Sequence, residues 1–140
     1  MTREEIVELF ARREAAFNEQ DVDGFVATFA EDAVVESPFG GTHQGRAAIT
    51  AVIKSAWDAF SNLTVTTDDL IIDGDRVVHV FTLSAIDTGG LMGMAPSGKP
   101  ALLPMVFVCR VADGFVTHER RIYDFTGMLV QLGVLKAKPA

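Results

Sequence analysis

The chain has 140 residues, 49% of them hydrophobic, and a net charge of −7. This length predicts one domain, residues 1–140, with enough apolar mass for a core, and the acidic charge argues against nucleic acid or an anionic membrane as partner. Cys109 is the single cysteine, which excludes an internal disulfide. Because no export signal or apolar run of about 20 residues occurs, we expect a cytoplasmic protein.

The N-terminus predicts a helix with a well-marked start. Thr2 and Glu5 match a capping box, so we expect a helix from about Arg3 to Asn18. Spacing of three to four residues gives this helix one apolar face. Its members are Ile6, Phe10, Arg13 and Phe17. Arg13 either lies along the apolar surface and reaches water, or points into a pocket and holds an anion.

The following segment predicts a corner made of a short helix and a strand end. Asp21 is a suitable N-cap for the short helix. The apolar side of that helix is expected to contain Phe25, Val26 and Phe29. Residues 33–37 are predicted to be extended, because β-branched residues precede Pro38, which cannot continue a helix. Gly40–Gly45 lacks the lysine of a phosphate-binding loop and is interpreted as a flexible connection.

A third helix, from about Arg46 to Phe60, is followed by a change to extended periodicity after Asn62. The core-facing side of this helix contains Ile49, Val52, Ile53, Ala56, Trp57 and Phe60. Asp73-Gly74 and Asp113-Gly114 favour tight turns, which makes two antiparallel hairpins from four strands. The predicted strands are Thr64–Ile72, Arg76–Asp87, Ala101–Ala112 and Phe115–Asp124.

Two further segments are predicted to lie near one end of the sheet. Thr88–Pro100 is too rich in Gly and Pro for regular structure, and its methionines suit either a lid over a pocket or a subunit interface. The tail, Phe125–Leu135, has apolar residues at helical spacing and is expected to cover the sheet or the open end of a pocket. Three helices followed by antiparallel strands indicate an α+β fold with the helices on one face.

The order of short motifs resembles that of two branches of the NTF2-like superfamily. Ala15–Asn18, Asp21–Gly24, Phe29–Ala33 and Glu36–Gly40 are similar to the N-terminal half of ketosteroid isomerases. Met92–Lys99, Asp113-Gly114 and Asp124 with Gln131–Gly133 resemble the C-terminal half of SnoaL-like polyketide cyclases. The resemblance implies a cone of three N-terminal helices packed on a curved antiparallel sheet, a deep apolar cavity and a homodimer.

The catalytic residues of these relatives do not carry over. The isomerase places an aspartate base before the proline, a tyrosine on the first helix and a protonated aspartate on a late strand; the matching positions hold Ser37, Arg13 and Phe107. The aspartate that cyclases and limonene-type epoxide hydrolases use on the last strand falls at Arg121. The hydrolase's earlier-strand Arg and Asp fall on apolar residues, among them Phe81. Whether the protein is an enzyme stays open.

Four polar residues are candidate catalytic groups. Strand alternation places Glu119, Arg121 and Tyr123 on one face, which the resemblance puts inside the cavity together with His79. His79 titrates near neutral pH and suits proton transfer, or is a hydrogen-bonded core residue. Glu119 is an acid or base, or forms a structural pair with Arg121 that lowers its pKa. Tyr123 donates to a ligand carbonyl, or fills space with its hydroxyl bonded locally.

The expected ligand is a small, mostly apolar molecule with a carbonyl or enol group. Residues expected to bind it are Arg13, Phe17, Ser37, Trp57, Phe81, Leu83 and Phe107, although Trp57 is also a natural core residue. No metal site is expected because the three histidines lie on separate elements, and no cofactor is expected. The chemistry would be of the acid–base isomerase or cyclase type. The alternative is a non-catalytic ligand-binding or dimeric accessory module.

Overall fold

A computed structural model describes residues 1–136 and 138 of the chain. Helix α1 (Arg3–Asn18) begins at the predicted capping box, in which the Glu5 N–H donates to Thr2 and the Thr2 N–H donates to Glu5. Helix α2 (Val22–Val26) is capped by Asp21, and α3 (Arg46–Ala59) ends one residue before the predicted position. The three N-terminal helices are therefore confirmed.

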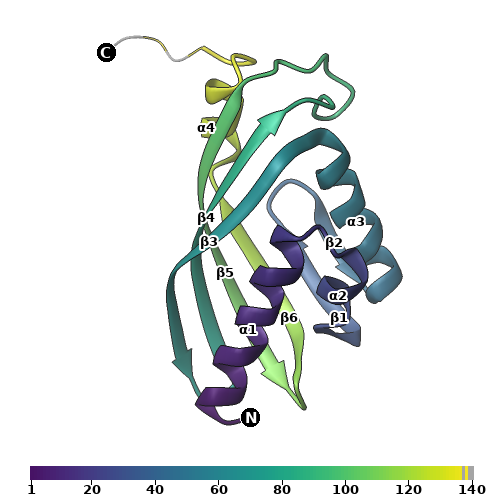
Figure 1. Cartoon of the computed structure of the whole chain (residues 1–140), viewed down its shortest axis with the longest axis vertical. Helices are drawn as coiled ribbons and strands as arrows, with labels where there is room; N and C mark the ends of the chain where they lie inside the picture. Colours follow the sequence, from purple (N-terminus) through teal and green to yellow (C-terminus); the bar gives the residue numbers. More distant parts are fainter. Residues whose placement is uncertain (137, 139–140) are drawn as a thin grey trace.

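The strands form one curved sheet. They are β1 (Phe29–Ser37), β2 (Gly41–Gln44), β3 (Phe60–Asp73), β4 (Arg76–Asp87), β5 (Pro100–Ala112) and β6 (Phe115–Tyr123). Their order across the sheet is β2-β1-β6-β5-β4-β3. Figure 1 shows the long strands β3, β4 and β5 bending along the molecule, with α1 crossing the sheet and α3 beside β2. This arrangement is the predicted α+β cone.

Three local predictions were wrong. Phe29 begins β1 instead of ending the second helix. Within the supposed flexible connection, Gly41–Gln44 forms β2 and pairs with β1, because Gly41 adopts a φ of +77° that permits a tight reversal. The sheet is also not wholly antiparallel, since β1 and β6 run parallel. No tight hairpin joins those two strands, so local turn signals do not set their direction.

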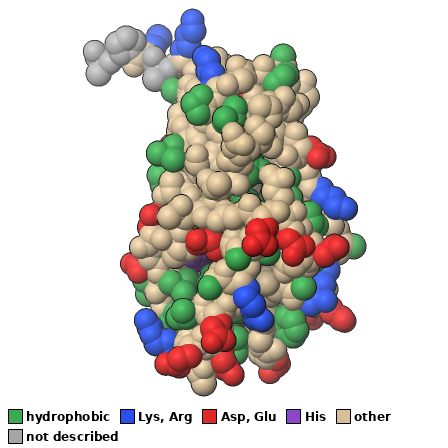
Figure 2. All heavy atoms as spheres, viewed as in Figure 1, with side chains coloured by type: hydrophobic (Ala, Val, Ile, Leu, Met, Phe, Trp, Pro, Cys, Tyr) green, Lys and Arg blue, Asp and Glu red, His purple; other side chains and the backbone are tan. Residues whose placement is uncertain are grey.

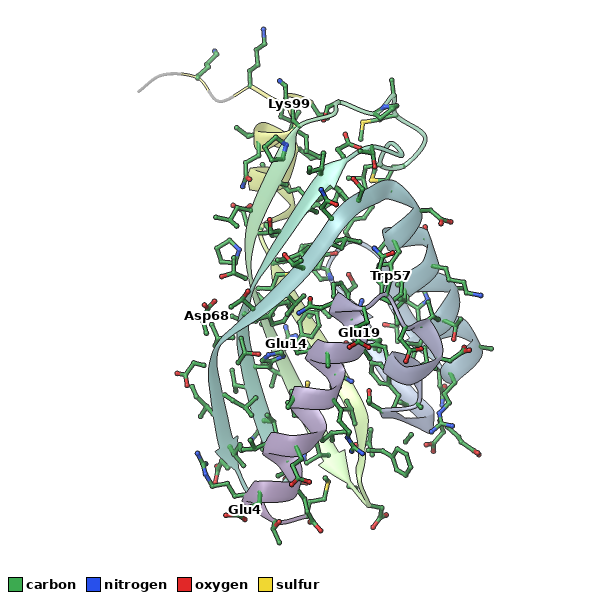
Figure 3. The ribbon with its side chains drawn as sticks, viewed as in Figure 1. Glu4, Glu14, Glu19, Trp57, Asp68 and Lys99 are labelled. Atoms are coloured by element: carbon green, nitrogen blue, oxygen red, sulfur yellow. The ribbon has the colours of Figure 1, made fainter. Side chains whose placement is uncertain are left out.

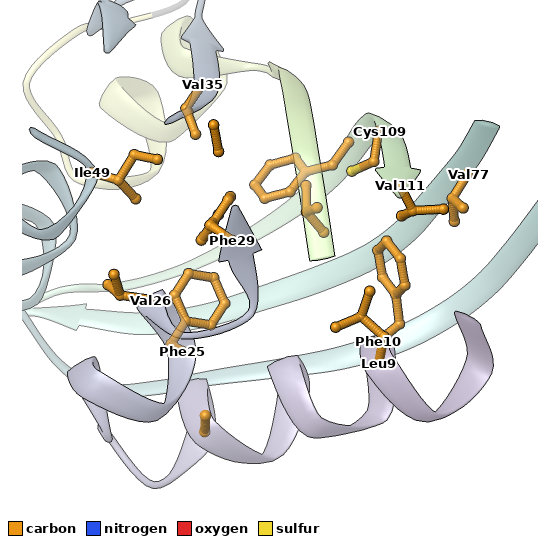
Figure 4. Packing of buried hydrophobic residues seen from close by; sticks show 14 of the residues in the cluster. Leu9, Phe10, Phe25, Val26, Phe29, Val35, Ile49, Val77, Cys109 and Val111 are labelled. Atoms are coloured by element: carbon orange, nitrogen blue, oxygen red, sulfur yellow. The ribbon is translucent and has the colours of Figure 1, made fainter. Parts of the chain in front are cut away.

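The core lies where α1 and α2 face the sheet. Leu9 and Phe10 of α1 pack toward Val77 and Val111 of the strands, as Figure 4 shows. Phe29, which is 0% exposed, joins the same cluster from β1. Burial of these side chains fixes α1 against the concave face of the sheet.

The opposite end of the molecule is closed by α4 (Phe125–Gln131), which Figure 1 places far from the N-terminus. This helix is shorter than the predicted Phe125–Leu135, but Met128 and Leu132 pack in a second apolar cluster as expected of a cover. The Phe125 ring stacks on Phe39 of the β1–β2 turn, with centroids 4.3 Å apart. Among the described residues, no helix is long and apolar enough to cross a membrane.

Candidate functional site

A pocket lies between the helices and the inner face of the sheet. Its volume is about 140 Å³ and its wall is mainly apolar. Helices α1 to α3 and strands β3 to β6 contribute the lining residues, which are Arg13, Glu14, Phe17, Phe25, Ile53, Ala56, Trp57, Phe60, Leu63, Val65, His79, Phe81, Leu83, Met105, Phe107 and Arg121. Trp57 projects between α3 and α1 in Figure 3.

Most of the predicted site residues belong to this wall. They are Arg13, Phe17, Trp57, His79, Phe81, Leu83, Phe107 and Arg121. Three predicted residues lie elsewhere: Ser37 and Tyr123 line a neighbouring groove, and Glu119 is buried behind the wall with 0% exposure. What each residue does for a ligand stays a prediction, because the geometry gives position and not activity.

The groove is open and much larger, with a volume of about 1090 Å³. It runs between α3, α4, the β1–β2 turn and the segment that follows β4. Pocket and groove share part of their wall, namely Ala56, Phe60, Leu83, Met105 and Arg121. In the groove, the hydroxyls of Ser37 and Tyr123 form a hydrogen bond of 2.7 Å. The Tyr123 hydroxyl is therefore bonded locally, one of the two alternatives that the sequence left open.

Behind the pocket, two guanidiniums share one buried carboxylate. Arg13 pairs with one oxygen of Glu119, and Arg121 Nε donates to the other oxygen at 2.8 Å. Arg13 also donates to the Thr28 hydroxyl at 3.0 Å, and its guanidinium lies 4.6 Å from the Phe29 ring centroid. With 3% exposure, Arg13 does not reach bulk water, so that interpretation was wrong.

This cluster carries a net positive charge. Burial alone would raise the pKa of the Glu119 carboxyl, but the charges of Arg13 and Arg121 outweigh it and hold that pKa below its ordinary value. Glu119 is thus an ionised anchor with both oxygens occupied. The predicted pairing with Arg121 is confirmed, whereas the stronger contact with Arg13, 106 residues away in the chain, was not foreseen.

His79 is 5% exposed and neutral at pH 7. Burial first, and then the Arg13 charge, lower its pKa to about 4. Its ring packs edge-on against Phe10 and lies 4.6 Å from the Phe81 centroid. The Nε2 atom lies 2.8 Å from the hydroxyl of Thr67. The interpretation of His79 as a hydrogen-bonded core residue is confirmed, whereas the expected titration near neutral pH was wrong, because burial lowers the pKa of the imidazole. His79 also lines the pocket, and its part in proton transfer stays a prediction.

Sequence reasoning missed Glu14 and Thr67. The carboxylate of Glu14 accepts from the backbone N–H of Thr67 at 3.0 Å and from its hydroxyl. In Figure 3, Glu14 projects from the side of α1 that faces β3. Thr67 pairs with Phe81 across β3 and β4 and so shares the inner face, just before a bulge at Asp68. The sequence did contain one indication of Thr67, which follows Val65 by two residues and so shares its face of the strand. The bulge after Thr67 interrupts this alternation and makes the indication hard to recognise.

Two other chemistries receive no support from the side chains. Burial raises the pKa of the Cys109 thiol, so this cysteine is an inert core residue, as expected. Among residues 1–136 and 138, no group of three or more His, Cys, Asp or Glu side chains is arranged to hold a metal ion.

The curved sheet with helices on one face and a pocket between them defines a protein of the NTF2-like class, and solved structures with NTF2-like and ketosteroid isomerase-like folds match it. The chain belongs to the SnoaL-like polyketide cyclase family, whose model matches residues 8–132. None of the curated proteins matches its sequence significantly.

Three solved structures illustrate the similarity. TsrD from Streptomyces laurentii is 24% identical with a TM-score of 0.85, covering 96% of this chain and 99% of TsrD. AclR from Streptomyces galilaeus, a suggested hydroxylase, is 25% identical with a TM-score of 0.85, covering 99% of this chain and 87% of AclR. IdmH from Streptomyces antibioticus, a suggested polyketide cyclase, is 27% identical with a TM-score of 0.79, covering 91% of this chain and 97% of IdmH.

Proposed function

We propose that the protein binds a small, mostly apolar molecule bearing a carbonyl or enol oxygen and promotes acid–base chemistry of the isomerase or cyclase type on it. The observation that carries this proposal is the Arg121 guanidinium in a mainly apolar pocket wall. Among the described residues, Arg121 donates to protein only through Nε, so its terminal N–H groups are free for a ligand oxygen. A guanidinium in a low-dielectric wall stabilises a developing enolate.

The size of the pocket supports a ligand that occupies both cavities. A cavity of roughly 150 Å³ accommodates a benzene ring, and the pocket has about 140 Å³. A molecule with more than one ring would therefore extend past Arg121 and Leu83 into the groove, where Tyr123 and Ser37 lie. IdmH is a suggested polyketide cyclase, an activity that forms rings, which supports a ring-containing ligand for this fold.

Within this proposal, His79 transfers protons and Glu119 holds the two arginines. The Nδ1 atom of neutral His79 is the pocket's available base. Glu119 does not line the pocket, so we assign it a positioning role in place of the acid–base role considered from the sequence. The single tryptophan, Trp57, lines the pocket and provides an optical reporter of occupancy.

The binding test uses 5-phenyl-1,3-cyclohexanedione, an acidic dione that is mostly an enolate anion at pH 7, and its neutral methyl enol ether. Titration of Trp57 fluorescence should show tighter binding of the dione, because its enolate oxygen accepts a charge-assisted hydrogen bond from Arg121. Arg121→Met should weaken that binding about 10- to 100-fold, the worth of a hydrogen bond to a charged group. Arg110→Met is the matched control, because Arg110 lies exposed on β5, pairs with Asp75 at 3.7 Å and does not line the pocket. Equal binding to wild type and Arg121→Met would contradict the proposal.

The test of catalysis is deuterium exchange at the carbon next to the carbonyl of 4-phenylcyclohexanone, followed by NMR. Wild-type protein should accelerate the exchange, and His79→Gln should abolish the acceleration while still binding the dione. Binding without accelerated exchange in the wild type would instead favour the alternative, a non-catalytic ligand-binding module. The low pKa of His79, about 4, is the observation that favours this alternative.

We also propose that the protein is a cytoplasmic homodimer. Leu102 of β5 and Ile122 of β6 are 59% and 48% exposed, and both point away from the pocket on the outer face of the sheet. Exposed apolar side chains on a sheet face suit an interface between copies. Light scattering after gel filtration should give twice the chain mass, and Ile122→Lys should give the monomer mass; a wild-type monomer would contradict the dimer.

A further inference from the structure

Three side chains form a continuous hydrogen-bonded path from solvent to the pocket. Thr67 is exposed, Glu14 is half-buried and His79 is buried. The Thr67 hydroxyl contacts both others: it bonds to the Glu14 carboxylate, and its oxygen lies 2.8 Å from His79 Nε2. The backbone N–H of Thr67 donates to the same Glu14 oxygen at 3.0 Å, so this contact is fixed from two directions.

The proton positions follow from the chemistry of these groups. A hydroxyl has one proton and an ionised carboxylate only accepts. The Thr67 hydroxyl donates its hydrogen to the Glu14 carboxylate, so toward His79 the Thr67 oxygen can only accept a hydrogen bond. The proton of the neutral imidazole must therefore reside on Nε2. Nδ1 then carries the lone pair.

Nδ1 of His79 has no protein hydrogen-bond partner among the described residues and is not fully buried. Every fully buried side-chain nitrogen or oxygen in the same residues does have a hydrogen-bond partner. Nδ1 therefore keeps accessible surface, and His79 belongs to the pocket wall. A ligand in the pocket meets an imidazole acceptor whose opposite nitrogen is tied to Thr67.

We propose that Glu14 and Thr67 are positioning residues that fix the Nε2–H tautomer of His79 and relay protons between the pocket and solvent. This inference rests on the proposed function for the ligand's part of the relay, but the tautomer is a property of the free protein. In this scheme both residues act on the ligand through His79.

The proton transfer balances without any other reactant. A ligand O–H or C–H bond breaks and Nδ1–H forms; Nε2–H breaks as Thr67 gains a proton on Oγ1, and the original Thr67 proton moves to the Glu14 carboxylate. Glu14 exchanges that proton with water, and the reverse sequence delivers it to the ligand. No atom changes its oxidation state.

The relay answers a difficulty created by the surroundings of His79. The charged groups near the imidazole are Arg13 and Glu14 from α1, Asp68 from β3 and Glu119 from β6. Burial and the Arg13 guanidinium oppose an imidazolium, so a histidine that merely stored the proton would be a poor base. Passing the second proton outward through Thr67 avoids a long-lived imidazolium.

The test records the ¹⁵N and proton correlations of the histidine rings in the full-length protein at pH 7, without ligand. The His79 signals, assigned by their loss in His79→Gln, should show a protonated Nε2 and an unprotonated Nδ1. Thr67→Val should produce a mixture of tautomers, and Thr67→Ser should restore the wild-type pattern. Thr82→Val is the matched control, since Thr82 donates to Asp68 at 2.7 Å on the outer face of the same strands.

Two results would overturn the inference: a proton on Nδ1 in the wild type, or an unchanged tautomer in folded Thr67→Val. If turnover is found, Thr67→Val and Glu14→Gln should each lower kcat by about 10- to 100-fold with little change in KM, below the full ~10²–10⁴-fold worth of general acid–base catalysis. An unchanged kcat would refute the relay. Failure of the proposed function gives a different pattern, because no ligand would bind while the Nε2–H tautomer would still be seen.

Discussion

Glu119 and His79 lie near the same pocket, but their surroundings prepare them for opposite roles. Both oxygens of Glu119 are occupied by guanidiniums, and the side chain is 0% exposed. Within the part of the chain that the structure describes, His79 has one nitrogen bonded, and its ring contributes to the pocket wall. A charged group that is fully paired holds structure together, whereas a neutral group with one free lone pair can react. Burial alone therefore does not identify a catalytic residue.

The largest expected effect comes from neutralising the anchor. Glu119→Gln should lower the free energy of unfolding by about 3–5 kcal/mol, because it leaves two buried guanidiniums without their counter-charge. Urea unfolding followed by circular dichroism measures this value. Glu36→Gln is the control: Glu36 pairs with His118 in an exposed setting, so its loss should cost less than about 1 kcal/mol. Similar losses for both variants would contradict the role of Glu119 as an anchor.

The pH dependence of stability should distinguish His79 from Glu119. His79 has a folded pKa of about 4 against 6.5 ordinarily, so the unfolded chain binds a proton more readily between these values. Stability should therefore fall as pH drops from 6.5 to 4, by about 3 kcal/mol from this residue. The lowered pKa of Glu119 affects stability at a lower pH. The contribution of Glu119 to the free energy of unfolding is complete above the ordinary carboxyl pKa and is lost as the pH falls below it.

Unfolding measured at a series of pH values checks this assignment. His79→Gln should flatten the slope between pH 6.5 and 4 while leaving the loss at lower pH. A slope that survives in His79→Gln would mean that another group titrates in this window.

A smaller effect is expected at Thr28, which supports the anchor from one side. The Thr28 hydroxyl accepts from Arg13 and donates to the Phe25 carbonyl at 2.6 Å. Thr28→Val should cost about 1–3 kcal/mol, because a buried guanidinium N–H loses its partner. Thr50→Val is the comparison, since the Thr50 hydroxyl bonds only to the Arg46 carbonyl within α3. Equal costs, measured by urea unfolding, would show that the Arg13 contact adds nothing.

The smallest effect should be at Tyr123, whose hydroxyl belongs to the groove. Tyr123→Phe removes one half-buried hydrogen bond to Ser37 and keeps the ring, so we expect a loss of about 0.5–1.5 kcal/mol in the free energy of unfolding. Phenol, a single-ring probe, should change the Trp57 fluorescence of the variant and of the wild type with the same affinity. A weakened phenol affinity would show that pocket and groove act as one site.

Local signals explain which parts of the fold were predictable. The capping box at Thr2 and the Asp-Gly turns act over a few residues, so the sequence determines α1 and the two hairpins directly. The parallel pairing of β1 with β6 joins segments that are distant in the chain, and no turn chemistry encodes it. The same limit hid β2, whose short pairing depends on β1 being in place.

The candidate site likewise has a part that the sequence predicts and a part that it does not. Alternation along β4 and β6 showed which residues share a face, and the family resemblance indicated that the face with His79 and Arg121 is the inner one. The contacts that decide their behaviour could not be read in advance: Arg13 meets Glu119 only after α1 docks on the sheet, and Thr67 reaches His79 beside a bulge. The positions of these side chains followed from periodicity together with the resemblance, whereas their charge states followed from tertiary packing.

The stacked rings of Phe39 and Phe125 have a consequence for how large molecules enter. The two rings are nearly parallel, at 9°, and they join the β1–β2 turn to the start of α4, two segments that both border the groove. Separating the two rings would cost about 0.5–1.5 kcal/mol, the worth of an aromatic pair. Thermal motion can break so weak a contact, and its loss would let the β1–β2 turn and the start of α4 move apart, which would widen the groove for a larger molecule.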